Sequence, residues 1–329
     1  MSITNHQRQS VSHPADVVEP IVRHFLPPAG LREVVTAQFL RLSLHLLFKP
    51  VMRPPWPLFV QRGVLHGLSV VMPGASGVTI RHEHIGRMPV ERITPKGSQP
   101  RHAVLYLHGG AFCTGSPRSH RSITTRLAKL TRAEVLVPHY RRVPEHPFPA
   151  QIEDTVTAYA QLLKDGYKPE YIAIVGDSAG CTLTFMATMA LRRAGLPLPA
   201  VLVMMSPAVD MSLTSRSAQE RADRDPMINL SWGRQAMAWY RVQHDHPLGN
   251  PMAQDLSDLP PALIQVGDDE VLFDDAHWVA HAAGQAGRHV ELEIYLKRWH
   301  VFQVHAGVLP SSTAALRRQA EFIRQHWRA

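Results

Sequence analysis

The pattern of apolar and polar positions divides the chain into two regions. Residues 16–25 and 31–48 repeat apolar side chains every three or four positions, which is typical of amphipathic helices, and a proline-rich break follows at residues 53–57. From about residue 77 onward, short apolar runs alternate with helical patterns. Such alternation predicts a mostly parallel sheet with helices on both faces.

Eight short segments have the pattern of strands. Two of them, AVLYL and YIAIV, are compact apolar runs typical of strands that are buried on both faces. The predicted strands are residues 77–82, 88–94, 103–107, 134–138, 171–175, 200–205, 262–266 and 290–296. The helices predicted among them and after them are residues 119–131, 150–164, 179–193, 271–286 and 311–327.

One segment interrupts this alternation. Residues 210–260 contain loops and one predicted helix at residues 229–241. Insertions of this kind, on the side where strands end, commonly shape binding pockets. We interpret residues 1–75 and about 210–245 together as a helical cap over an α/β domain at residues 76–329.

Composition and charge exclude several classes of protein. The net charge of the 329 residues is +8, but the basic residues are scattered without a run of like charges, so we expect a solvated basic surface and no nucleic-acid partner. Cys113 and Cys181 do not make a disulfide framework, and the N-terminal segment MSITNHQRQS lacks the pattern of a signal peptide, so a cytoplasmic location is expected. The twenty histidines lack metal-ligand spacing, so we expect no metal.

The most apolar stretch near the N-terminus is too short to span a bilayer. Residues 42–51 are interrupted by polar side chains, and we therefore expect no stable membrane insertion, although residues 42–48 could contact lipid. The sequence leaves the oligomeric state open, with a homodimer among the candidates.

A serine lies at a sharp predicted turn. Gly176-Asp177-Ser178-Ala179-Gly180 follows a predicted strand and opens a predicted helix. A G-x-S-x-G sequence in this setting is typical of a nucleophile elbow, which holds the serine hydroxyl at the head of a helix. The free N–H groups of the first helical turn favour developing negative charge. Ser178 is therefore the candidate nucleophile, and Asp177 is either a residue that braces the site or a plain loop carboxylate.

A glycine-rich segment, HGGAF at residues 108–112, follows the AVLYL strand directly. An acyl-transfer enzyme must stabilise a tetrahedral oxyanion, usually with backbone N–H groups, and glycine lets the backbone lie against a substrate because it has no Cβ. In α/β hydrolases the loop at this point supplies such donors. We therefore expect an oxyanion hole made by the N–H groups of Gly109, Gly110 and Ala179.

The base and its acid should follow the serine in the chain. A serine hydroxyl needs a histidine to take its proton, and the histidine needs a carboxylate to hold its tautomer. His300 follows the last predicted strand and is the candidate base, with His305 as the competitor on the next helix. The spacing alone leaves four acids open, namely Asp268, Asp269, Glu270 and Asp274.

Five segments in this order resemble the hormone-sensitive-lipase family of bacterial esterases, the α/β-hydrolase fold-3 group. They are HGGAF at 108–112, YRRVPEHPFPA at 140–150, GDSAG at 176–180, PPALIQVGDDEVLFDD at 260–275 and WHVFQ at 299–303. The resemblance covers about residues 75–325. It implies an α/β-hydrolase catalytic domain, a helical cap formed in part by the N-terminus, esterase activity on short- to medium-chain acyl esters, and no cofactor.

The resemblance also bears on single residues. The family carries Asp-Pro-Leu at the acid position, and aligning residues 270–272 with that pattern puts Glu270 there, with Asp268 as the alternative. The third glycine of the family's HGGG is Ala111 here, which is compatible if only the first two donate. Cys181 stands where glycine is frequent; we expect it to pack under the elbow, with its thiol pKa lowered by the helix N-terminus.

Three functions are consistent with these residues. The first is a carboxylesterase acting on a small-molecule ester. The second is an amidase or lactonase, because the same Ser-His-acid triad serves all acyl transfers. The third is a non-catalytic binding protein on the same fold. The presence of all three triad residue types favours an enzyme.

Overall fold

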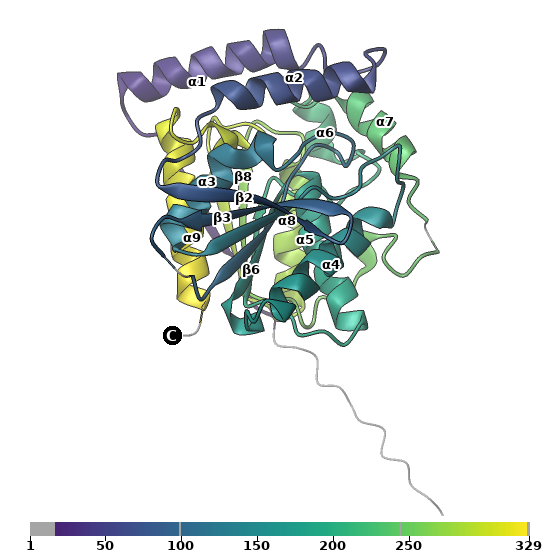
Figure 1. Cartoon of the computed structure of the whole chain (residues 1–329). Helices are drawn as coiled ribbons and strands as arrows, with labels where there is room; N and C mark the ends of the chain where they lie inside the picture. The colour runs from purple at the N-terminus through teal and green to yellow at the C-terminus, as the bar shows by residue number, and fades with distance from the viewer. Residues whose placement is uncertain (1–16, 99, 244, 328–329) are drawn as a thin grey trace, which may run out of the picture.

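The computed structural model describes residues 17–98, 100–243 and 245–327. The N-terminal segment MSITNHQRQS, for which we expect no signal peptide, lies outside the described residues. The described part is built on one nine-stranded sheet of order β1-β9-β8-β7-β6-β4-β5-β3-β2 (Figure 1). Neighbouring strands pair in parallel, except that β3 is antiparallel to both β2 and β5. The strands are β1 (Ile21–Phe25), β2 (Val78–Ile85), β3 (Met88–Pro95), β4 (Ala103–Leu107), β5 (Glu134–Pro138), β6 (Ile172–Asp177), β7 (Val201–Met205), β8 (Ala262–Gly267) and β9 (Val290–Tyr295).

Helices connect most of these strands. The α-helices are α1 (Leu31–Ser43), α2 (Leu58–Val71), α3 (Arg121–Thr131), α4 (Ala150–Lys164), α5 (Ala179–Arg193), α6 (Arg216–Glu220), α7 (Leu230–Tyr240), α8 (Phe273–Gln285) and α9 (Pro310–His326). The short helices are the π-helix η1 (Leu44–Phe48) and the 3₁₀ helices η2 (Arg118–His120), η3 (Pro169–Tyr171), η4 (Pro251–Ala253) and η5 (Phe302–His305).

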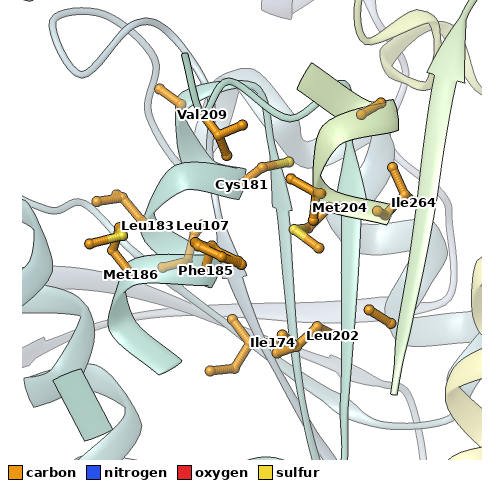
Figure 2. Close-up of a cluster of buried hydrophobic side chains, with 14 of the residues drawn as sticks. Leu107, Ile174, Cys181, Leu183, Phe185, Met186, Leu202, Met204, Val209 and Ile264 are labelled. Carbon is orange, nitrogen blue, oxygen red and sulfur yellow. The ribbon is translucent and has the colours of Figure 1, made fainter. Parts of the chain in front are cut away.

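The sheet is covered on both faces because its central strands are apolar on both sides. In β4, Val104 and Tyr106 belong to one core with α3 and α9, whereas Leu105 and Leu107 belong to the core under α4, α5 and α8. This alternation follows from the two-residue period of a strand. Figure 2 shows part of the second core, where side chains of α5 meet those of the neighbouring strands.

The eight predicted strands are confirmed, but the sheet has a ninth, and the helix predicted at residues 16–25 is wrong in its described part. Ile21–Phe25 forms β1, which pairs in parallel with β9 and stacks the ring of Phe25 on Tyr295. The apolar residues of this segment have helical spacing, yet Pro20 and Pro27 bracket it, and the open edge of β9 supplies the hydrogen bonds of a strand. Only the folded sheet presents that edge.

The helices of the two predicted cap segments lie at the carboxyl end of the sheet, where α1, η1 and α2 form a layer with α6 and α7 beside them (Figure 1). Ile21–Phe25 of the first segment belongs to the sheet as β1 and not to this layer. Helix α2 is not among the helices predicted from the sequence, which include none at Leu58–Val71. The indole Nε1 of Trp232 in α7 donates to Gln61 Oε1 in α2 at 2.9 Å, and Lys49 Nζ donates to the carbonyl oxygens of Ala222 and Asp225. The two segments therefore contact each other. None of the described helices has the length and apolarity needed to cross a membrane.

Candidate active site

Ser178 lies at the turn between β6 and α5. Its backbone has φ 53° and ψ −123°, a strained conformation for a residue with a side chain, and its N–H donates to Met205 O at 2.8 Å. The flanking glycines are required by packing: a Cβ on Gly176 would lie against the backbone of Gly180, and a Cβ on Gly180 against Leu107 O. The turn thus has the geometry of the predicted nucleophile elbow.

His300 lies in the loop after β9, and its ring is buried. Its Nδ1 is 2.8 Å from Glu270 Oε2. Burial opposes protonation of this imidazole, but the hydrogen bond and charge of Glu270, with smaller contributions from Asp225 and Asp177, outweigh it and raise the pKa of His300. The competitor His305 lies in η5, and burial lowers its pKa to about 4.

Glu270 is fully buried, and each of its carboxylate oxygens has a defined role. Oε1 accepts hydrogen bonds from Gly267 N at 2.6 Å and from Ser206 Oγ at 3.0 Å, which leaves Oε2 to His300. The Ser206 hydroxyl in turn accepts from Val301 N at 3.0 Å. Ser206 therefore joins the loop that carries the acid to the loop that carries the histidine.

The other three candidate acids have partners elsewhere. Asp268 accepts from Lys297 N, Asp269 pairs with arginines of the cap, and Asp274 accepts from Ser217 N. None of them hydrogen-bonds to His300 in the part of the chain that the structure describes. The contact with the imidazole belongs to Glu270.

The HGGAF loop lies beside the turn that carries Ser178. Gly110 has φ 115° and lines the cavity next to Ser178. Gly109 is buried beneath it, and a Cβ there would lie against Asp177. A hydrogen bond from the Gly109 backbone is among the causes that lower the pKa of Asp177. Of the two glycines, Gly110 is the one that borders the cavity, and Ala179 begins α5 on the other side of Ser178.

Asp177 interacts with two other buried side chains next to Ser178. Its carboxylate accepts from Tyr106 OH at 2.7 Å and lies 3.2 Å from His120 Nε2, and all three side chains are buried. Burial raises the pKa of Asp177, but the charge and hydrogen bond of His120 and the hydroxyl of Tyr106 outweigh it, so the net shift is downward. Of the two interpretations of Asp177, the structure supports the bracing residue.

The expectation for Cys181 is half right. The thiol packs under the elbow, where it donates to Gly176 O at 3.1 Å and Met205 O at 3.2 Å. Burial raises its pKa, however, and this outweighs any effect of the helix N-terminus. The expected lowering is wrong because the thiol has no access to solvent.

A cavity of about 290 Å³ opens beside the candidate nucleophile. Its walls come from α1, η1, α2, α7 and the loops of the sheet, and they are almost entirely apolar. The cap side chains that line it include Phe39, Leu40, Leu44, Leu47, Phe48, Leu65, Leu68 and Trp232, and Gly110, Ser178 and His300 line it as well. The arrangement suits an apolar ligand with one reactive polar group.

Several residues around the site were not singled out from the sequence. Ser206 and Asp225 lie buried next to the Glu270 loop, and Asp225 accepts hydrogen bonds from Met227, Ile228 and Val271 N–H groups. The one available signal was that Ser206 follows the strand β7 at the edge where active-site residues gather.

Known proteins share this fold and sequence. A family model described as alpha/beta hydrolase fold matches residues 104–304. The chain is 41% identical over 242 residues to an acetyl-hydrolase of Streptomyces hygroscopicus. The alignment covers 73% of this chain and 81% of that protein. It is 33% identical over 283 residues to an esterase of Acinetobacter venetianus, covering 84% and 93%.

Solved structures agree with the sequence relatives. An esterase from the bacterial hormone-sensitive lipase family superposes with a TM-score of 0.83 at 35% identity, covering 92% of this chain and 100% of that chain. The structure of the esterase EstE5 also has a TM-score of 0.83, at 36% identity and the same coverage. The chain therefore belongs to the α/β-hydrolase-fold family, among the bacterial esterases related to hormone-sensitive lipase, and is an esterase.

Proposed function

We propose that this esterase hydrolyses short- to medium-chain carboxylic esters with a triad of Ser178, His300 and Glu270. The observation that carries the proposal is the buried hydrogen bond of 2.8 Å between His300 Nδ1 and Glu270 Oε2, beside a cavity that Ser178 also lines. A histidine held in this way has its Nε2 free to accept a proton.

In the proposed first half-reaction, Ser178 Oγ attacks the ester carbonyl carbon and its proton passes to His300 Nε2. The N–H groups of Gly110 and Ala179 donate to the oxyanion; Gly109, the third predicted donor, packs against Asp177 and has the lesser part. The C–O bond to the alcohol then breaks, and the alcohol leaves with the proton from His300. The product is an acyl-enzyme on Ser178.

In the second half-reaction, water attacks the acyl carbon and gives its proton to His300. The bond to Ser178 Oγ breaks, the carboxylic acid leaves, and the proton returns to the serine. Glu270 stays ionised throughout and stabilises each imidazolium state. Burial strengthens this effect, because the ion pair forms where the local dielectric constant is low.

The size of the cavity supports short to medium acyl chains. Its volume of about 290 Å³ is near the lower end of ligand pockets, which run from roughly 300 to 1,000 Å³. The names of the relatives point the same way: one is an acetyl-hydrolase, and the EstE5 crystal was soaked by p-nitrophenyl butyrate. We also propose that the helices of the predicted cap residues 1–75, namely α1, η1 and α2, act with residues at about 210–245 as one cap that closes this cavity.

A serine-directed organophosphate tests the nucleophile. We expect one mole of label per mole of protein, lost in Ser178→Ala, and loss of p-nitrophenyl butyrate hydrolysis in the same proportion. Ser212→Ala, at an exposed cap serine, is the matched control and should label fully. If the wild-type protein takes up no label, or Ser178→Ala still takes it up, the proposed nucleophile is refuted.

A panel of p-nitrophenyl esters, anilides and lactones tests the substrate class. We expect the highest kcat/KM for esters of short- to medium-chain acids, since the cavity volume is near the lower end for ligand pockets. A preference for anilides or lactones would replace the carboxylesterase with the amidase or lactonase, and binding without turnover would indicate the non-catalytic protein.

A further inference from the structure

The outer side of α1 and η1 is apolar although it faces away from the protein. Of the sixteen large apolar side chains that are exposed in the described residues, all but Met252 lie in residues 17–70. Six of them lie on one side of this helix and define the outer stripe, Leu31, Val34, Val35, Phe39, Leu42 and Leu46. The exposed polar residues Gln38 and His45 lie among them. An ordinary surface helix has polar residues on that side.

The inner side of the same helix is also apolar and packs on the protein. Leu40, Leu44 and Phe48 are buried there. Apolar side chains on a protein surface are normally covered by a partner when they gather in one stripe, and no residue that the structure describes covers the outer stripe. In Figure 1, α1 and α2 form the top of the molecule, with no other described element above them.

The charges around the stripe favour one kind of partner. Residues 31–72 contain four arginines and one lysine but a single acid, Glu33, which is buried and ion-paired with Arg298. Arg32 and Arg53 are exposed and form no ion pair with any residue that the structure describes. An exposed apolar stripe in a segment that has unpaired exposed arginines and no exposed acid of its own fits an anionic lipid surface.

A second copy of the chain is the less favourable occupant. Packing two outer stripes together would bring the cations of both segments near each other without an exposed acid in either segment to pair with them. We therefore propose that the outer stripe of α1 and η1 docks the protein on anionic lipid surfaces, lying in the plane of the interface without crossing it.

The position of the cavity gives this docking a consequence. Phe39 and Leu47 line the cavity and are also 68% and 65% exposed, so its mouth opens next to the stripe. Docking would turn the mouth toward the lipid, where apolar esters concentrate. This consequence rests on the proposed esterase site, but the docking itself does not.

Vesicle sedimentation with the full-length protein tests the docking. We expect binding to phosphatidylcholine vesicles that contain one quarter phosphatidylglycerol, much weaker binding to phosphatidylcholine alone, and loss of the difference near 1 M salt, where the screening length is about 3 Å. The variant Arg32→Gln/Arg53→Gln should bind anionic vesicles about 25-fold more weakly, since each cation near an anionic surface contributes about fivefold.

An apolar variant separates docking from folding and catalysis. Leu31→Gln/Leu42→Gln/Leu46→Gln changes exposed side chains that do not line the cavity, so hydrolysis of dissolved p-nitrophenyl acetate should be unchanged while vesicle binding falls at least about tenfold. Met252→Gln, at the exposed apolar residue outside this region, is the control and should bind like the wild type.

Three results would overturn the proposal. The first is no vesicle binding by the wild-type protein. The second is equal binding to both vesicle types, because the cations would then have no role. The third is that light scattering shows a dimer for the wild-type protein and a monomer for the triple variant, and that neither binds vesicles. This result would assign the stripe to a second copy of the chain. Vesicle binding is measured without substrate, so failure of the proposed triad would leave it intact.

Discussion

Replacing Glu270 with glutamine should convert the site into one whose histidine has the wrong tautomer. Oε1 of Glu270 accepts two hydrogen bonds, from Gly267 N and Ser206 Oγ, so the position must remain an acceptor in the variant. The amide oxygen of the new side chain will therefore take the place of Oε1, and its NH2 group will face His300 Nδ1 in place of Oε2. Nδ1 must then accept, which puts the ring proton on Nε2.

A histidine with its proton on Nε2 cannot take the proton of Ser178. The equivalent change of tautomer in chymotrypsin-type proteases lowers kcat about 10⁴-fold, and we expect a loss of about that size here, or roughly 5.5 kcal/mol in the barrier. The size and shape of the side chain are kept and each buried polar atom retains a partner, so the free energy of unfolding should change by less than about 1 kcal/mol.

The assay is kcat for p-nitrophenyl butyrate, with urea unfolding as the test of folding. Asp268→Asn is the matched control, because this half-buried carboxylate follows the same strand, is the alternative acid, and makes no contact with His300. It should retain kcat within about threefold. A Glu270→Gln variant that keeps more than a tenth of the wild-type kcat, or an inactive but folded Asp268→Asn, would refute the assignment.

Three further predictions follow from the same geometry. The proposed mechanism requires neutral His300, whose pKa is raised, so kcat/KM should rise with pH through a value above 6.5. In Glu270→Gln the hydrogen bond and charge of Glu270 are lost, and burial is opposed only by the smaller contributions of Asp225 and Asp177, so the residual acid limb should move to lower pH; an unmoved limb would mean that another group titrates. Gly180→Ala should lower the free energy of unfolding by at least about 2 kcal/mol, because the Cβ of the new alanine meets Leu107 O. Gly63→Ala, in open space on α2, is the control and should not destabilise the protein. Equal urea midpoints for the two variants would contradict the packing argument. Both thiols are buried, and burial raises the pKa of Cys113 to about 12. The native protein should therefore not react with Ellman's reagent at pH 8, whereas the urea-unfolded protein should show two reactive thiols. Rapid reaction of the native protein would contradict the burial of the thiols.

The features that depend on short-range pattern could be predicted without a structure. Buried parallel strands are continuous apolar runs, so their positions were readable, and the family motifs placed Ser178 and His300 after the right strands. The elbow is local in part: Gly176 is needed by the turn itself, because a Cβ there would meet Gly180, whereas Gly180 is needed because Leu107 O of β4 lies against it. Apart from that contact, the physical cause of these features lies within about ten residues of chain.

Other features depend on contacts between residues that are far apart in the chain, so they became visible only once the chain was folded. Residues 21–25 became a strand because β9 offers an open edge some 270 residues later, which outweighs their helical spacing. The spacing left four carboxylates open and the family resemblance favoured Glu270 over Asp268, but the hydrogen bond of Glu270 to the imidazole depends on Ser206 and Gly267, which hold its other oxygen. The outer stripe of α1 is likewise invisible in sequence: an apolar pattern predicts burial, and whether a partner covers both sides of a helix depends on how the whole chain packs.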